Sequence, residues 1–219
     1  MTAESNPPAR RGCLFYFLVI LVVGTLLLLL ATGIAVYSFK KVTTAWVQDY
    51  TDTMPAPIEK VEYTPDQVKA LQGRWLAFQE GLDKKQAGEL ILSAEDLNAF
   101  IHEDPNLRGR VFVYIDGSRL KGDVSMPLDQ IGPLRVEKLK GRYLNGTVSF
   151  SVATSNGLLE VHLEDVKVKA RPLPSLALSE LRKQNLAEGF MKNPEAARRT
   201  AQLDSVTVTN GQVILRSKP

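Results

Sequence analysis

The sequence predicts an α+β protein: one N-terminal transmembrane helix followed by an antiparallel-sheet domain with helices packed on one face. One observation is an uncharged apolar run that opens the chain. The other is that segments with an apolar period of two, separated by Asp-Gly and Asn-Gly turns, occupy the second half, with helical periodicity before and between them. Strands grouped together with helices around them are typical of α+β folds.

The predicted span covers residues 12–39, a run of 28 residues without a charge. A helix rises about 1.5 Å per residue, so about 20 apolar residues cross a bilayer core of about 30 Å. A cleaved signal peptide stays open as an alternative, because Ala31-Thr32-Gly33 resembles a small-residue cleavage site. We favour a retained anchor, since the apolar region of a signal peptide has only about 7–15 residues.

Positive charges flank the span on both sides, as Arg10-Arg11 and Lys40-Lys41, so the positive-inside count does not decide its orientation. Because a short tail before a first span usually stays inside, we expect residues 1–11 to form a cytoplasmic tail. The bulk of the chain then lies outside the cytoplasm, on a single-pass protein of the cell (inner or plasma) membrane.

The charge balance of the rest of the chain argues against some functions. Of 27 basic and 24 acidic residues, four and one lie in residues 1–41, so residues 42–219 carry 23 of each. A neutral domain lacks the basic surface that binds phosphate backbones, and we expect no nucleic-acid partner. The one cysteine, Cys13, lies at the membrane edge, so the domain has neither a disulfide nor a thiolate metal site.

Residues 40–62 are predicted to be a juxtamembrane stalk or linker. Four large side chains recur at every fourth position and define one helix face: Val42, Trp46, Tyr50 and Met54. This face either packs on the domain or lies in the membrane interface. Pro55 and Pro57 end the helix.

The domain, predicted for residues 63–219, begins with two helices. Thr64, Pro65 and Gln67 form a capping-box start, and an apolar stripe follows at Val68, Leu71, Trp75, Phe78 and Leu82. After a short strand at 89–92, Ser93 and Asp96 mark the start of a second helix that ends before Pro105.

Strands follow. Residues 111–115 are apolar on both faces, which predicts a central, covered strand. Asp116-Gly117 turns the chain into a return strand from Arg119 to about Met126. A short edge strand is expected at 134–137. Residues 148–152 and 159–163, on either side of Asn156-Gly157, alternate so that one face is buried and one is wet, and Val166 and Val168 follow.

The last part of the chain alternates again between helix and strand. We expect a helix from Ser175 to about Ala187 and another short helix after Asn193. A hairpin closes the domain between residues 206 and 215, around the turn Asn210-Gly211.

Side chains for chemistry are scarce. His102 and His162 lie in different elements, without the partners of a metal site, and no nucleophile elbow, P-loop or dinucleotide motif is present. The sequence therefore predicts no enzyme, no catalytic residue, no cofactor and no metal. One sequon, Asn145-Gly146-Thr147, has meaning only in a host that glycosylates exported chains.

A basic segment offers the one candidate contact. Arg135, Lys138, Lys140 and Arg142 alternate with apolar residues, and such a segment can meet anionic lipid head groups. The alternative is a charged, solvated edge strand.

A resemblance rests on residues 92–101, LSAEDLNAFI. They resemble the LT-x-x-DLN-x-L-[IL] opening of YpmS-like bacterial membrane-anchored proteins. The later order of hairpin, Leu173-Pro174, helix and closing hairpin is similar to these and to envelope proteins with a lipid-binding-like fold. The resemblance covers about residues 90–215 and implies an envelope domain.

Together these patterns predict a membrane-anchored, non-enzymatic domain that binds a lipid or another apolar ligand. We expect helices and sheet to enclose an apolar groove for an acyl chain, with the basic residues 135–142 at its mouth. The alternative is a structural or interaction scaffold that binds a protein partner in an envelope complex.

Overall fold

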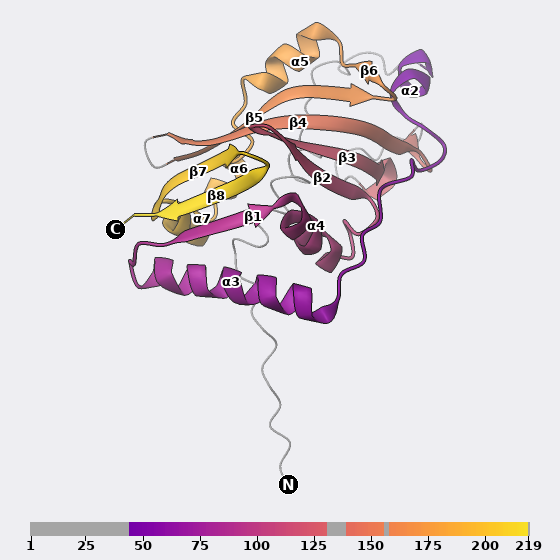
Figure 1. The fold of residues 1–219 in the computed structure, drawn as a ribbon. Coiled ribbons are helices and arrows are strands. Elements are labelled where there is room, and N and C mark those ends of the chain that lie inside the picture. The colour runs from indigo at the N-terminus through magenta and orange to yellow at the C-terminus, as the bar shows by residue number, and fades with distance from the viewer. Residues whose placement is uncertain (1–43, 131–138, 156–157, 219) are drawn as a thin grey trace.

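The computed structural model describes residues 44–130, 139–155 and 158–218 (Figure 1). This part of the chain is an α+β structure in which every strand pairing is antiparallel, as predicted. The predicted span, residues 12–39, lies outside the described residues. Of the helices within them, none is long and apolar enough to cross a membrane.

The elements follow one another in this order: α2 Thr44–Tyr50, α3 Pro65–Asp83, β1 Glu89–Ser93, α4 Ala94–Glu103, β2 Val111–Asp116, β3 Arg119–Pro127, the 3-10 helix η1 Leu128–Gln130, β4 Tyr143–Ser155, β5 Leu158–Val168, β6 Arg171–Pro172, α5 Ser175–Arg182, α6 Glu188–Met191, α7 Pro194–Thr200, β7 Leu203–Thr209 and β8 Gln212–Ser217.

The strands form two sheets. The larger has the order β2-β3-β4-β5-β6, and the smaller has the order β1-β8-β7. They meet where the Thr154 side chain of β4 accepts a hydrogen bond from the Val206 N–H of β7, at 2.9 Å. The sequence predicted each strand of the smaller sheet but not their union, because β1 and β8 pair across more than one hundred residues.

Three helices begin at the caps predicted from short sequence signals. Thr64 and Ser93 each form the predicted capping box, and the Asn193 side chain caps α7. Helix α5 begins at Ser175 as predicted, but its N-cap residue is Pro174 and it ends at Arg182, short of the expected Ala187.

One hydrophobic core joins the elements. The predicted stripe of α3 is buried at Leu71, Trp75, Phe78 and Leu82. In the larger sheet, the buried face of the central strands includes Phe150 on β4, which is 1% exposed, and Val161 on β5. The alternation read from the sequence for these two strands is therefore confirmed.

The prediction of a central, covered strand at residues 111–115 is wrong, since β2 is the edge strand of the larger sheet. Helix α4 covers this edge: the Asn98 amide bonds the backbone N–H and C=O of Val113. On the opposite side of the sheet, β6 pairs with β5 only at residues 167 and 168. Farther along β5, Asn185 accepts from the Val161 N–H and donates to the Leu159 C=O. Asparagine side chains thus occupy strand backbone groups on both sides of the sheet, which opposes pairing with another chain there.

Candidate functional site

The segment that joins α2 to α3 is held on the large sheet by a group of side-chain and backbone contacts. We call residues 51–63 the strap. Figure 1 shows that the strap leaves α2, passes the ends of the large-sheet strands and enters α3. These ends lie together because Tyr143 pairs with Pro127 and Val111 pairs with Val124. The strap therefore follows one end of the five-stranded sheet.

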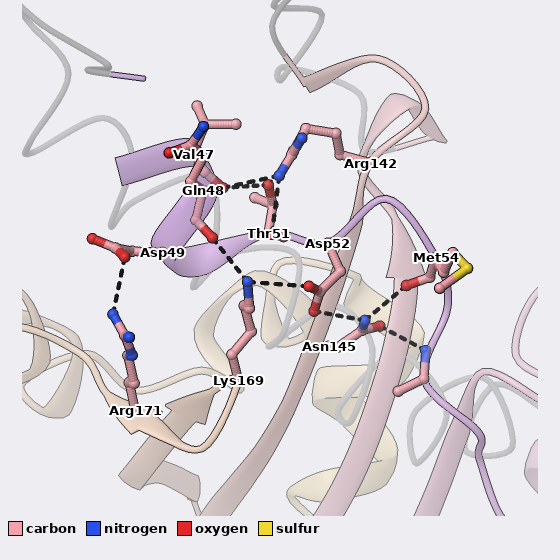
Figure 2. Close-up of polar contacts among 11 residues, drawn as sticks. Val47, Gln48, Asp49, Thr51, Asp52, Met54, Arg142, Asn145, Lys169 and Arg171 are labelled. Carbon is pink, nitrogen blue, oxygen red and sulfur yellow. Dashed lines mark hydrogen bonds and ion pairs between the residues drawn. The ribbon is translucent and has the colours of Figure 1, made fainter. Parts of the chain in front are cut away.

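Arg142 holds the C-terminal end of α2 (Figure 2). Its guanidinium donates hydrogen bonds to the Thr51 side-chain oxygen, to the Thr51 C=O at 3.1 Å and to the Val47 C=O at 3.4 Å. The last carbonyl groups of a helix have no partner within the helix, and a cation there also complements the helix dipole. Arg142 thus attaches α2 to the sheet, and Val47 of this helix is buried.

Asn145 fixes the first half of the strap with one side chain. Its Nδ2 donates to Asp52 Oδ2 at 3.0 Å and to the Met54 C=O at 2.9 Å. Its Oδ1 accepts from the Ala56 N–H at 3.1 Å and from Ser125 Oγ at 2.9 Å. Both protons of Nδ2 are engaged, so the sequon nitrogen is not available for a glycan in the folded domain.

Backbone pairing and ion pairs complete the attachment of α2. Asp52 and Tyr143 exchange two backbone hydrogen bonds, of 2.9 and 2.7 Å. Lys169 lies 3.1 Å from Asp52 Oδ1 and also donates to the Gln48 C=O at 2.9 Å. Arg171 pairs with Asp49 at 2.9 Å, but both side chains are largely exposed, so that pair adds little. We call the contacts of residues 47–56 with the sheet the clasp.

The structure describes two of the four predicted head-group residues. Arg135 and Lys138 lie outside the described residues. Lys140 is exposed, and Arg142 is directed to α2 as described above. The basic segment was predicted from its charge pattern alone, whereas the partners of Arg142 lie 91 to 95 residues away in the sequence.

A half-open cleft of about 490 Å³ lies under the second half of the strap. Its walls are residues 59–63 of the strap, helix α4 and the start of β2 with the turn before it. The lining is mainly apolar and includes Val61, Tyr63, Ile101, Val111 and Phe112. The sequence shows apolar residues on both faces of 111–115. Phe112, on the second of these faces, lines the cleft.

Tyr63 is the titratable group of the cleft that departs most from its ordinary state. Its ring packs edge-on against His102, with the ring centroids 5.7 Å apart. Burial raises the pKa of Tyr63 to about 12, and the carboxylates of Glu95, Asp96 and Glu59 act in the same direction. The hydroxyl is shielded from solvent, and no partner for it occurs among the described residues. It therefore stays protonated at neutral pH.

Charged side chains at the rim of the cleft balance one another. Glu59, Lys60, Glu62 and Arg108 line it, and the structure pairs none of them with an opposite charge within its described ranges. Arg108 Nε donates to the His102 C=O at 2.6 Å. Two positive and two negative groups give these four residues no net charge, and neither described residue of the basic segment, Lys140 or Arg142, lines this cleft.

Neither a metal-ligand cluster nor a known relative identifies the function of the site. Within residues 44–130, 139–155 and 158–218, no group of three or more His, Cys, Asp or Glu could hold a metal ion. Comparisons with protein families, with curated proteins and with solved structures found no match. The resemblance of residues 92–101 to YpmS-like proteins stays a prediction. The structure gives this segment a physical role, since Asp96 completes the α4 cap and Asn98 covers the edge of β2.

Proposed function

We propose that the chain is a single-pass, membrane-anchored, non-enzymatic domain outside the cytoplasm that binds a lipid or another apolar ligand beside the bilayer. The observation that carries the proposal is the position of the cleft. It opens at the end of the five-stranded sheet to which α2 is attached, and α2 follows the predicted span in the sequence.

The distance from the bilayer is short in this proposal. Only residues 40–43 separate the predicted span from α2. Four extended residues reach at most about 14 Å. The side of the domain to which α2 is attached is therefore tethered close to the bilayer in this proposal. The clasp holds α2 on the sheet through residues 47–56. The strap that follows α2 therefore adds no slack between the predicted span and the sheet.

The volume of the cleft indicates the size of ligand that we propose. A methylene group takes roughly the volume of a water molecule, about 30 Å³, so 490 Å³ accommodates about 16 carbons. A volume of this order suits a single acyl chain. Apolar clefts of this volume with a few polar groups are the usual form of small-ligand sites.

The proposal is tested by counting bound lipid on the full chain. We would purify it in mild detergent with a 3:1 mixture of phosphatidylethanolamine and phosphatidylglycerol and count retained molecules by native mass spectrometry. Val61→Trp fills the cleft from the strap, and Leu158→Trp adds the same side chain at a position that is 56% exposed. We expect Val61→Trp to lose lipid that the wild type and Leu158→Trp keep. Equal retention in all three contradicts the proposal.

The orientation is tested separately, by labelling cells with an impermeant maleimide. Cys13 is the natural cysteine of the predicted inner side, and Leu158→Cys places a second one on an exposed strand end. Spheroplasts replace intact cells where an outer membrane intervenes. We expect label on position 158 and none on Cys13; the reverse pattern contradicts the topology.

The second candidate function is a scaffold in an envelope complex. It is favoured by two large apolar side chains that stay exposed on the α3 and β1 side of the domain, Leu76 at 42% and Ile91 at 38%. Two isolated residues are less than the patch of a typical interface, so this function ranks second. It becomes the leading one if the cleft retains no lipid.

A further inference from the structure

The strap connects the clasp to the cleft with little structure of its own. Its first half is bonded to the sheet at residues 52, 54 and 56. Its second half forms a wall of the cleft and then enters α3 through the Thr64 cap. Within the described chain, residues 57–62 form neither a backbone nor a side-chain hydrogen bond. The position of the wall therefore depends on how the two ends of the strap are held.

The strap is also stiff. Pro55 and Pro57 flank Ala56, and proline fixes its own φ near −65° and restricts the residue before it. Ala56 N–H is the last bonded group before the wall, and it donates to both Asn145 Oδ1 and Ser125 Oγ at 3.1 Å. A shift of the clasp at Ala56 is therefore expected to displace the start of the cleft wall, which begins at Glu59.

We propose, on the basis of the proposed function, that the strap couples docking of the anchor-proximal helix α2 to occupancy of the cleft. When the clasp is closed, residues 59–63 are held over α4 and β2, and the cleft binds its ligand. When α2 leaves the sheet, the wall moves and the ligand is released to the bilayer. Coupling of this kind is reciprocal, so a bound ligand also holds the clasp closed.

Asn145 gives the sharpest test, because its amide is the main link and its partners are all in the strap or beside it. Asn145→Ala opens the first half of the strap. Asn185→Ala is the matched control, since it removes a similarly bonded amide beside the start of β5, at the end of the same sheet that lies away from the strap. Retained lipid would be counted on the full chain with the lipid mixture named above.

We expect Asn145→Ala to lower lipid retention at least fivefold relative to Asn185→Ala, the lower limit of typical allosteric coupling. Equal retention in the two variants overturns the coupling and leaves the proposed function intact. If the wild type retains no more lipid than Val61→Trp, the proposed function fails and the coupling fails with it.

A second variant covers the case in which Asn145→Ala does not fold. Ala56→Pro removes the N–H donor to Asn145 and Ser125 while leaving both side chains in place. We expect the same loss of lipid. Reciprocity is measured by hydrogen exchange: added lipid should slow exchange of the Asp52 and Ala56 amides in the wild type but not in Val61→Trp. Exchange unchanged by lipid in the wild type overturns the coupling.

Discussion

The side-chain amide of Asn98 forms two hydrogen bonds with the backbone of a single residue, Val113. Oδ1 accepts from the Val113 N–H at 2.7 Å, and Nδ2 donates to the Val113 C=O at 2.6 Å. Nδ2 also donates to the Ala94 C=O at 2.9 Å, which fixes the amide to its own helix. The side chain therefore takes the place of a neighbouring strand and joins α4 to the exposed edge of β2.

Replacement of Asn98 by alanine should lower the free energy of unfolding by about 1–3 kcal/mol, because the N–H and C=O of Val113 lose their partners in a buried position. Asn106→Ala is the control, since Asn106 is exposed and its side chain has no hydrogen-bond partner in the part of the chain that the structure describes. It should change stability by less than about 0.5 kcal/mol. Urea unfolding followed by tryptophan fluorescence measures both. An equal effect of the two substitutions would show that the edge is covered by other means.

Two phenylalanines distinguish the centre of the sheet from its edge. Phe150 on β4 is 1% exposed, and Phe150→Ala should cost about 3–5 kcal/mol. Phe112 on the edge strand is half-buried in the wall of the cleft, so Phe112→Ala should cost clearly less. The same unfolding experiment decides between them. A larger loss of unfolding free energy for Phe112→Ala than for Phe150→Ala would contradict the edge position of β2.

The difference between these two strands shows what could be read from the sequence. Helix caps at Thr64 and Ser93 and the turn at Asp116-Gly117 were predicted because their signals lie within a few residues. The edge position of β2 and the second sheet depend on pairings between distant segments, which no local pattern encodes. Arg142 and Asn145 were missed as docking residues for the same reason, since their strap partners lie about 90 residues earlier.

Gly146 is required where β4 approaches β5. A Cβ at this position would lie 2.6 Å from the backbone oxygen of Lys167, a contact that backbone on both sides cannot relieve cheaply. Gly146→Ala should therefore destabilise the domain. Gly73→Ala, in an open position of α3, should stabilise it by about 0.5–1 kcal/mol, because alanine has the higher helix propensity. Thermal unfolding of both variants checks the opposite signs; a neutral Gly146→Ala would contradict the close approach.

Alkaline pH should weaken the domain through Tyr63. The pKa of this phenol is about 12 in the folded state, against about 10 in an unfolded chain. Between these values the folded state keeps a proton that the unfolded state has lost, so stability falls as pH rises. The raised pKa values of Tyr114 and Lys121 act in the same direction. Tyr63→Phe should therefore reduce, and not abolish, the loss of urea midpoint between pH 9 and pH 11. An unchanged slope would place the Tyr63 hydroxyl in solvent.

The most direct test of the account is to find where an acyl chain lies on the protein. The full chain would be incorporated in bilayers that contain a phospholipid with a diazirine near the end of one acyl chain, irradiated, and mapped by peptide mass spectrometry. A lipid site in the cleft predicts cross-links at residues 59–63 of the strap and at residues 101–112, in addition to the predicted span. The cross-links at the cleft should be lost in Val61→Trp. Cross-links confined to residues 12–39 would contradict a lipid site in the cleft.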